Sequence, residues 1–386
     1  MKILNQIFKM LMGLAIGIVG GLAIAAAIVV AFTDTTFPEF FARFATAKFA
    51  EAAGAGLVAM AAFIIGFMVL IPVHEAGHLV AGLLSGYKFV SFRIFNYTII
   101  RIDGKLRVKK YAVAGTGGQC LLLPPEVEVE RVPTAWYNLG GVLANLLVLP
   151  LLLALVFIDG HPYLSVFAWV LVLVDVLILL FNGVPMKISG TANDAYNALS
   201  LRNNPVAKRG LVLALKTNAK IQDGVRPRDM PDEWFEVPAH INYRDQLEVS
   251  LPLMAASRLL DNVDFDKARE AFENLYAHKS EIIGLYVKEL ECELVFLRLI
   301  TGDADGASQL LTPELRKYIE AYRSTMSSKE RVLCAMALYL DKDPDKAREI
   351  FSGLSGRRAD YLLQGEVSSD LAIMEEMLLR HDRAEG

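Results

Sequence analysis

The sequence predicts a membrane protein with an all-α core of four transmembrane helices, a small β-hairpin insertion and a cytoplasmic α-solenoid. Apolar residues make up 54% of the 386 residues, and the mean hydropathy of +0.38 is high for a soluble protein. Residues 1–190 hold four long apolar runs and carry 13 Lys/Arg and 10 Asp/Glu, whereas residues 191–386 carry 26 and 33. This shift, together with a repeated motif after residue 260, indicates a membrane half followed by a soluble, acidic half.

Charge and cysteine content exclude several classes of protein. Neither half is basic enough to suggest that the chain binds nucleic acid. The three cysteines, Cys120, Cys292 and Cys334, are widely spaced and odd in number. They therefore indicate neither a disulfide framework nor a cysteine-ligated zinc site.

Four segments are long and apolar enough to form membrane-spanning helices, which need about 20 residues each. The first, Leu11–Phe32, has no charged residue and exceeds the apolar core of about 7–15 residues of a signal peptide, so we expect an uncleaved span. The other three segments are Leu57–Leu84, Trp136–Ile158 and Tyr163–Val184.

The basic residues of the connections predict the orientation of these spans. Eight Lys/Arg lie between the second and third spans, two lie in the 33–56 loop, and none lies in the 159–162 turn. Because Lys and Arg concentrate in cytoplasmic loops, both termini are expected to face the cytoplasm. The sequence thus predicts a multi-pass protein of the plasma membrane.

A His-Glu-x-x-His motif, residues His74 to His78, lies inside the second apolar run. Residues four apart share a helix face, so both imidazoles can bind one tetrahedral zinc ion, with Glu75 placed as general base. These three are the only ionisable side chains between Leu57 and Leu84, and ionisable groups at membrane depth are costly and indicate function. The alternative, histidines buried only for packing, leaves two histidines and a glutamate in hydrocarbon with no other charge to pair them. The sequence therefore predicts a Zn²⁺ cofactor and hydrolysis within the membrane.

The depth of the motif can be estimated from the helix rise. From Leu57 at the outer side, His74 lies 17 residues in, or about 26 Å at 1.5 Å per residue. In a hydrocarbon core of about 30 Å, this position is close to the cytoplasmic boundary. Hydrolysis needs water, which lipid does not supply, so we expect a cavity that water enters from the cytoplasm.

The remaining zinc ligand is expected to be a carboxylate, because the third histidine of the membrane half, His161, lies in the outer turn. Two candidates exist: Asp175 within the fourth span and Asp194 just after it. Measured from Tyr163, Asp175 is about 18 Å deep, roughly 8 Å short of His74.

The segment after the fourth span favours Asp194. Asn182 is about 28 Å deep, level with the histidines, and Gly183, Pro185 and Gly190 should break the helix beyond it. Irregular backbone at that depth is tolerated only along a cavity, and a chain that returns there brings Asp194 to the zinc. Asn193 or Asp194 could instead simply start the next helix, Ala195–Leu201, so Asp175 remains the alternative ligand.

These residues resemble a known family. His74–His78 in one span, with Asn182-x-x-Pro185 and Asp194 after another, are similar to the motifs of the site-2 protease family of intramembrane zinc metalloproteases. The resemblance covers roughly residues 50–200. It implies a core formed by the second to fourth spans and a His-His-Asp zinc site.

The resemblance also implies roles for single residues. Glu75 would be the general base, Asn182 would lie near the site, and Asn145 matches a family asparagine that helps hold the substrate; Asn145 and Asn182 are therefore the expected substrate-binding residues. Three features depart from the family: Asp194 precedes alanine where glycine is usual, it lies 12 positions after Asn182 where the usual spacing is a few residues shorter, and valine follows Gly141 where proline is usual.

Residues 89–132 predict a β-hairpin. A β-like alternation of apolar and polar residues occurs in Phe89–Phe95 and in Leu106–Tyr111. Between them lies Asp103-Gly104, a hairpin turn signal. An ordinary cytoplasmic hairpin is the simple interpretation. The family resemblance implies a β-element near the site, whose open edge could pair with an extended substrate segment.

The C-terminal part contains a repeat. Asp264–Glu270 is echoed at Asp303–Ala307 and Asp343–Glu349, and the alanines at 268, 307 and 347 are 39 and 40 residues apart. Each echo opens a helix after an acidic turn and follows another helical stretch, which resembles tetratricopeptide-like helix pairs, although those repeat every 34 residues. Such a stack offers a concave face that could bind a cytoplasmic protein partner.

Together these features predict the organisation and the function. The expected regions are 1–54 (first span and outer loop), 55–200 (protease core), 201–245 (linker) and 246–386 (helical repeat). We expect an intramembrane zinc endopeptidase that cuts transmembrane or signal-peptide-like protein substrates near the cytoplasmic side. The alternatives are an inactive membrane adaptor, against which the intact Glu75 argues, and a transporter with Asp175 on its ion path, which four spans without internal repeat do not favour.

Overall fold

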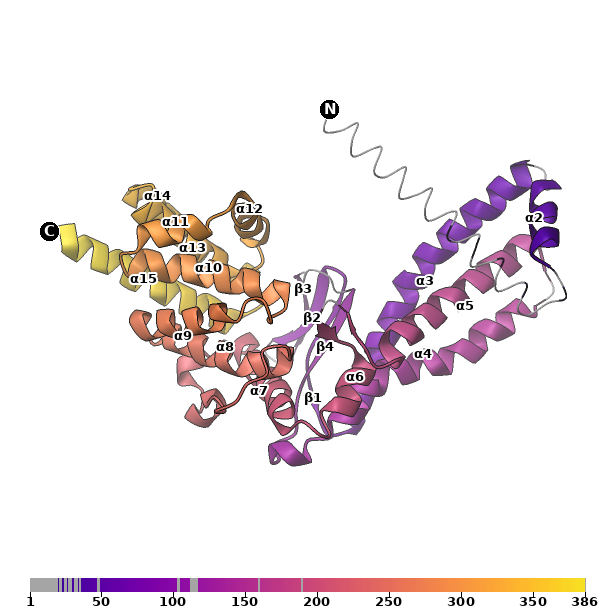
Figure 1. Cartoon of the computed structure of the whole chain (residues 1–386), viewed down its shortest axis with the longest axis horizontal. Coiled ribbons are helices and arrows are strands. Elements are labelled where there is room, and N and C mark those ends of the chain that lie inside the picture. The colour runs from indigo at the N-terminus through magenta and orange to yellow at the C-terminus, as the bar shows by residue number, and fades with distance from the viewer. Residues whose placement is uncertain are drawn as a thin grey trace. The chain divides into compact units, whose positions relative to one another are not determined.

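A computed structural model of the chain (Figure 1) describes residues 36–46, 49–102, 105–111, 117–158, 160–188 and 190–385, and positions 20, 23, 26, 30 and 34. The expected first span, Leu11–Phe32, lies outside the described residues except at four of these single positions. By its contacts the chain divides into two compact units, Met1–Gly66 with Leu152–Val172, and Phe67–Leu151 with Leu173–Gly386. The His-Glu-x-x-His motif, both candidate aspartates and the C-terminal repeat all belong to the second unit.

Three helices are long and apolar enough to cross a membrane. α3 (Phe49–Leu84), α4 (Thr134–Val156) and α5 (Pro162–Gly183) contain windows of mean hydropathy 2.6, 2.5 and 2.8, and they coincide with the second, third and fourth expected spans. A short helix, α2 (Phe37–Thr46), precedes them. Among the described residues the structure thus supports three spanning helices, where the sequence predicts four in the whole chain.

Two glycines set the distance between α3 and α4. A Cβ atom on Gly77 would overlap the carbonyl oxygen of Gly140, and a Cβ on Gly140 would overlap the carbonyl oxygen of Gly77. Small residues allow helix backbones to approach closely in membranes, where association depends on packing. The crossing places the Gly140–Asn145 segment of α4 directly against the His-Glu-x-x-His turn of α3.

The β-insertion contains the expected hairpin within a larger, four-stranded antiparallel sheet. Its strands are β1 (Lys88–Ile94), β2 (Tyr97–Ile102), β3 (Lys105–Lys110) and β4 (Gly118–Leu123), in the order β3-β2-β1-β4. The chain already reverses at Phe95 and Asn96, so β1 pairs with β2, with Arg93 opposite Thr98, and not with β3. Phe95 has a positive φ of 50°, which is uncommon for a non-glycine residue. The turn at Phe95 therefore carries no usual sequence signal. β2 and β3 form an antiparallel hairpin with Ile102 opposite Lys105, around the expected Asp103-Gly104 turn, and these two residues themselves lie outside the described residues.

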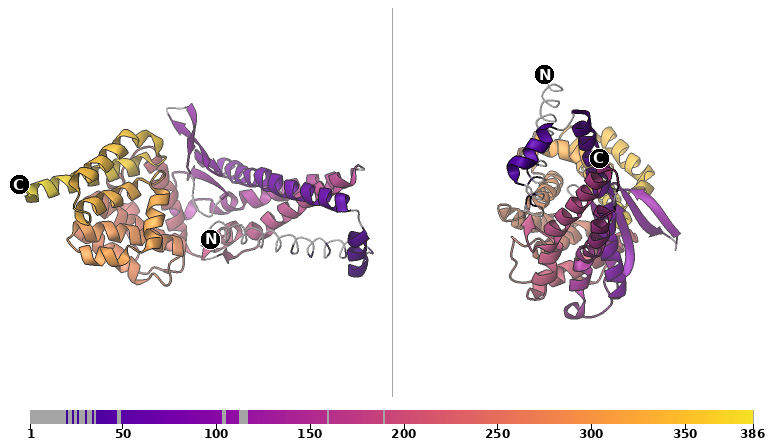
Figure 2. Two further views of the ribbon diagram at one scale, coloured as in Figure 1. Left: turned by 90° about the horizontal axis from the view of Figure 1, so that it is seen from above. Right: turned by 90° about the vertical axis from the view of Figure 1, so that its right-hand side faces the viewer.

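The chain from α6 onward is mostly helical: α6 (Asp194–Ser200), α7 (Pro205–Gln222), α8 (Gln246–Asp261), α9 (Phe265–Ala277), α10 (Gly284–Ile300), α11 (Ala304–Leu310), α12 (Pro313–Tyr322), α13 (Ser327–Tyr339), α14 (Pro344–Gly356) and α15 (Gln364–Glu385). Four short 3-10 turns also occur: η1 (Val129–Arg131), η2 (Pro227–Asp229), η3 (Asp232–Phe235) and η4 (Arg358–Asp360). Figure 2 shows helices α8–α15 gathered into one group.

The three sequence echoes occupy equivalent places at helix starts. Asp264, Asp303 and Asp343 are the N-caps of α9, α11 and α14, and each side chain accepts a hydrogen bond from a backbone N–H three residues later. The alanines at 268, 307 and 347 are fully buried in one core. The units are not uniform, because α11 has only seven residues and the additional helix α12 follows it.

Helix α7 joins the sheet to the C-terminal helices (Figure 1). Its Val212 and Leu215 pack in a small core with Tyr87, Leu121 and Leu122 of the sheet region, and it also contacts η1, α8 and α15. The predicted linker, 201–245, thus contains a packed helix. A second connection comes from Lys109 of β3, whose Nζ donates hydrogen bonds of 2.8 and 2.9 Å to the carbonyl oxygens of residues 359 and 361.

Candidate metal centre

The two histidines of the motif lie one above the other on the buried face of α3. His74 and His78 are 7% and 9% exposed, their ring centroids are 4.9 Å apart, and the rings are nearly perpendicular. Their Nε2 atoms lie 3.2 Å from each other. The i, i+4 spacing therefore brings the two imidazole edges to one point.

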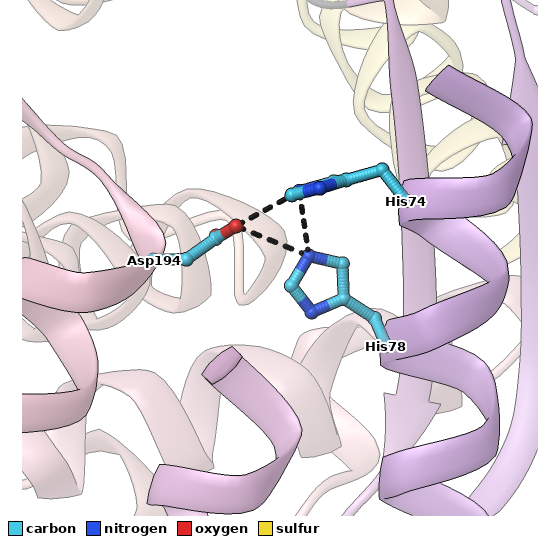
Figure 3. Close-up of side chains that lie close together, drawn as sticks. All are labelled: His74, His78 and Asp194. Atoms are coloured by element: carbon cyan, nitrogen blue, oxygen red, sulfur yellow. Dashed lines mark hydrogen bonds and ion pairs between the residues drawn. The ribbon is translucent and has the colours of Figure 1, made fainter. Parts of the chain in front are cut away.

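Asp194 completes the group from the other side (Figure 3). Its Oδ2 lies 2.9 Å from Nε2 of His74 and 3.3 Å from Nε2 of His78. The ligand-capable atoms of the three residues all lie within 4.8 Å of one another, so the group could hold a metal ion. Of the two candidate carboxylates, Asp194 is thus the one that the structure brings beside both histidines.

The chain after α5 places Asp194 by a local hydrogen-bond network. α5 ends at Gly183, and a two-stranded turn, β5 (Lys187–Ile188) with β6 (Thr191–Ala192), leads to α6. Asn193 caps α6 by accepting from the Tyr196 N–H, and its amide donates to the carbonyl oxygens of Phe181 and Val184. One side chain therefore satisfies both the end of α5 and the start of α6. Asp194 is the first residue of α6, beyond this cap, and its carboxylate is free to point at the histidines.

The Nδ1 nitrogen of each imidazole faces a hydrogen-bond acceptor. His74 Nδ1 is 2.8 Å from Oδ1 of Asn145, and His78 Nδ1 is 2.7 Å from the backbone carbonyl oxygen of Tyr137. A neutral imidazole carries one N–H, and these acceptors require it on Nδ1. The Nε2 lone pairs of both rings then face each other and the Asp194 carboxylate, where a metal ion could bind.

Asp194 contributes a carboxylate oxygen to this group. An ionised carboxylate and two neutral imidazoles are a typical donor set for a divalent transition metal.

Gly141 of α4 forms the floor under the two rings. A Cβ atom at this position would lie 2.5 Å from Cε1 and Nε2 of His74 and 2.6 Å from Nε2 of His78. Contacts below 3.0 Å are essentially never tolerated. Any larger residue at 141 would therefore push the imidazoles out of their positions.

Glu75 faces a cavity beside the three ligands. The cavity has a volume of about 500 Å³, and its wall includes His74, Glu75, His78, Asp194, residues 117–120 and Asn182. Glu75 lies against the first residue of β4, where a Cβ atom on Gly118 would be 2.6 Å from its Oε1. The apolar part of the wall consists of Phe67, Ile71, Leu177, Ile178 and Phe181.

The two asparagines expected to bind substrate lie in different surroundings. Asn182 lines the cavity, and its amide donates a 3.0 Å hydrogen bond to the Ile178 carbonyl of its own helix. Asn145 is fully buried, does not line the cavity, and bonds both His74 and Asp175. Asp175 thus reaches the histidines only through Asn145.

Sequence reasoning missed three contributors to this site: Gly141, Gly118 and the Tyr137 carbonyl. Gly141 and Gly118 matter because they lack a side chain, and the Tyr137 group belongs to the backbone, so the residue type carries no signal for either role. Asn193 was expected as a possible start of the helix that follows it, and the structure confirms it as the N-cap.

Comparison with known proteins gives no relative from which a function can be transferred. No protein-family model, no curated protein and no solved structure matches this chain. Any assignment of function therefore depends on the chemistry of the site.

Proposed function

We propose that this chain is an intramembrane zinc endopeptidase that hydrolyses membrane-spanning or signal-peptide-like segments near the cytoplasmic side. One observation carries the proposal: two imidazole nitrogens and a carboxylate oxygen converge beside the Glu75 carboxylate, at a cavity among membrane-spanning helices. The site-2 protease resemblance of the same residues agrees with it.

The donor atoms fit zinc. Ligand distances of about 2.0–2.2 Å in a tetrahedral zinc site correspond to ligand-to-ligand distances of about 3.3 Å. The three distances among His74, His78 and Asp194 are 2.9, 3.2 and 3.3 Å. A zinc ion held there would lower the pKa of a bound water to about 7 and polarise the scissile carbonyl.

The protein residues supply the remaining roles. Glu75, in the cavity wall, accepts a proton from the attacking water and delivers it to the leaving amine. The Asn145 and Tyr137 acceptors keep both histidines in the metal-binding tautomer. Asn182 is the remaining candidate to contact substrate within the cavity.

The walls of the cavity suit an apolar, extended substrate. Phe67, Ile71 and Phe181 offer contacts to the side chains of a membrane-spanning segment. β4 is an edge strand, and its residues 118–120 line the cavity. A helical substrate hides its backbone, so a segment that unwinds and adds to the β4 edge presents its peptide bond to Glu75.

The C-terminal helices are proposed to form a tetratricopeptide-like solenoid that recruits a cytoplasmic partner or gates the substrate. Their contacts support this role, because α7 packs on the sheet that carries β4 and Lys109 ties β3 to the segment before α15. In this proposal the C-terminal helices and both termini face the cytoplasm, which the Lys and Arg residues of the connections favour.

Cleavage during co-expression tests the proposal. The full-length chain is expressed with a panel of tagged single-span proteins, and released fragments are detected by immunoblot. Glu75→Gln should reduce cleavage at least ~100-fold, since general bases contribute about 10²–10⁴-fold, while the purified variant retains zinc. Glu51→Gln, in the first turn of the same helix, is the matched control and should cleave normally. Equal cleavage by Glu75→Gln and the wild type would refute the mechanism.

A further inference from the structure

Three buried side chains, one from each membrane-spanning helix, form a chain that ends at the metal centre. Asp175 of α5 accepts a 2.6 Å hydrogen bond through Oδ1 from Nδ2 of Asn145 on α4. Asn145 Oδ1 in turn accepts a 2.8 Å bond from Nδ1 of His74 on α3. Asp175 and Asn145 are both 0% exposed, and neither lines the cavity.

The surroundings of Asp175 require an explanation. It lies in a helix window of mean hydropathy 2.8, and its second carboxylate oxygen, Oδ2, is buried without a hydrogen-bond partner. A carboxyl group at membrane depth is costly, and such residues are usually functional. Asp175 is not a metal ligand in this geometry, because its contact with the site passes through Asn145.

We propose that Asp175 and Asn145 are positioning residues that fix His74 as a metal ligand. The inference rests on the proposed zinc site and goes beyond it by assigning the buried aspartate a role. It also gives Asn145 a role other than substrate binding.

The direction of the two hydrogen bonds carries the argument. The Asp175 oxygen accepts, so the Asn145 amide must present its NH₂ group to Asp175 and its oxygen to His74. That oxygen requires the His74 proton on Nδ1, which leaves the Nε2 lone pair facing His78 and Asp194.

A rotated Asn145 amide shows what Asp175 prevents. Rotation would set the amide oxygen against the Asp175 oxygen at 2.6 Å, two acceptors in contact. It would also place the NH₂ group of Asn145 against His74 Nδ1. That nitrogen would then accept a hydrogen bond, so the ring proton would lie on Nε2. A proton at Nε2 would occupy the position where the metal binds.

The test compares zinc affinity and kinetics of full-length variants in detergent. Partners that orient a ligating histidine typically contribute 10–100-fold to metal affinity, so Asp175→Leu and Asn145→Leu should each weaken zinc binding 10–100-fold in competition with a chromophoric chelator. Asp175→Asn keeps an acceptor oxygen and should recover most of the affinity. Leu180→Val, at an exposed position of α5, is the control and should match the wild type.

The outcomes separate this inference from the proposed function. Wild-type affinity in Asp175→Leu and Asn145→Leu, or a raised KM with unchanged zinc affinity in Asn145→Leu, would overturn the positioning role alone. A wild-type chain that binds no zinc would overturn the proposed function and the positioning role together. Circular dichroism and size-exclusion chromatography show whether Asp175→Leu folds. If it does not fold, the zinc affinities of Asp175→Asn and Asn145→Leu are compared instead. An equal loss of affinity in both variants overturns the inference, and a recovered affinity in Asp175→Asn supports it.

Discussion

Replacement of Gly141 by alanine should damage the metal centre without disturbing the helix that carries it. The new Cβ would lie 2.5 Å from His74 and 2.6 Å from His78, whereas ordinary contact begins at 3.4 Å. The rings must therefore retreat by about 0.9 Å, several times the roughly 0.2 Å over which metal–ligand distances are tolerated. Alanine itself favours a helix by about 1 kcal/mol over glycine, so the damage cannot be assigned to a weakened α4.

Zinc affinity is the appropriate measurement for Gly141→Ala. We expect a loss of at least tenfold, or about 1.4 kcal/mol, with a parallel loss of cleavage. Gly56→Ala is the matched control, because Gly56 also lies in a membrane-spanning helix but has no atom within 4 Å of the added Cβ. If Gly141→Ala binds zinc as tightly as Gly56→Ala, the two imidazoles do not rest on Gly141 and the proposed arrangement of the ligands is wrong.

Two further predictions address Glu75 and the C-terminal helices. In Gly118→Ala, the added Cβ would displace the Glu75 carboxylate. Cleavage should therefore fall at least about tenfold, while the affinity for zinc stays constant. A loss of zinc would contradict the separate role of Glu75. Burial, reinforced by the Asp370 carboxylate, raises the pKa of Glu366 from 4.5 to about 8. The folded-state pKa thus exceeds the unfolded one, so the contribution of Glu366 to stability is complete below its unfolded pKa and is lost as the pH rises through about 8. Urea unfolding between about pH 5 and pH 9 should show stability falling less in Glu366→Gln than in the wild type; identical slopes would contradict it.

The convergence of His74, His78 and Asp194 was predictable from sequence because each position follows from a local rule. The four-residue spacing fixes His74 and His78 on one face of any helix. Gly183, Pro185 and Gly190 end α5 and allow the return that places Asp194. The link from Asp175 to His74 was not predictable, since it depends on how three helices are rotated about their axes and on the Asn145 side chain between them.

The fold was predictable where periodicity is strong and less so where it is weak. The three apolar helices and the helix starts at Asp264, Asp303 and Asp343 follow from span length and capping. β4 was missed because its Gly-Gln-Cys-Leu-Leu-Leu sequence does not alternate; its side chains at 120–122 are buried. The sheet order was missed because the turn at Phe95 lacks the residues that usually mark one.

Metal analysis of the purified full-length chain tests the central claim most directly. The wild type and Glu75→Gln should each contain about one zinc ion per chain, because Glu75 is not a ligand, whereas Asp194→Ala and His78→Ala should lose most of it. This pattern, with cleavage in the wild type alone, is the predicted result. A wild-type chain without zinc, or zinc retained in both ligand variants, would contradict the proposed metal centre.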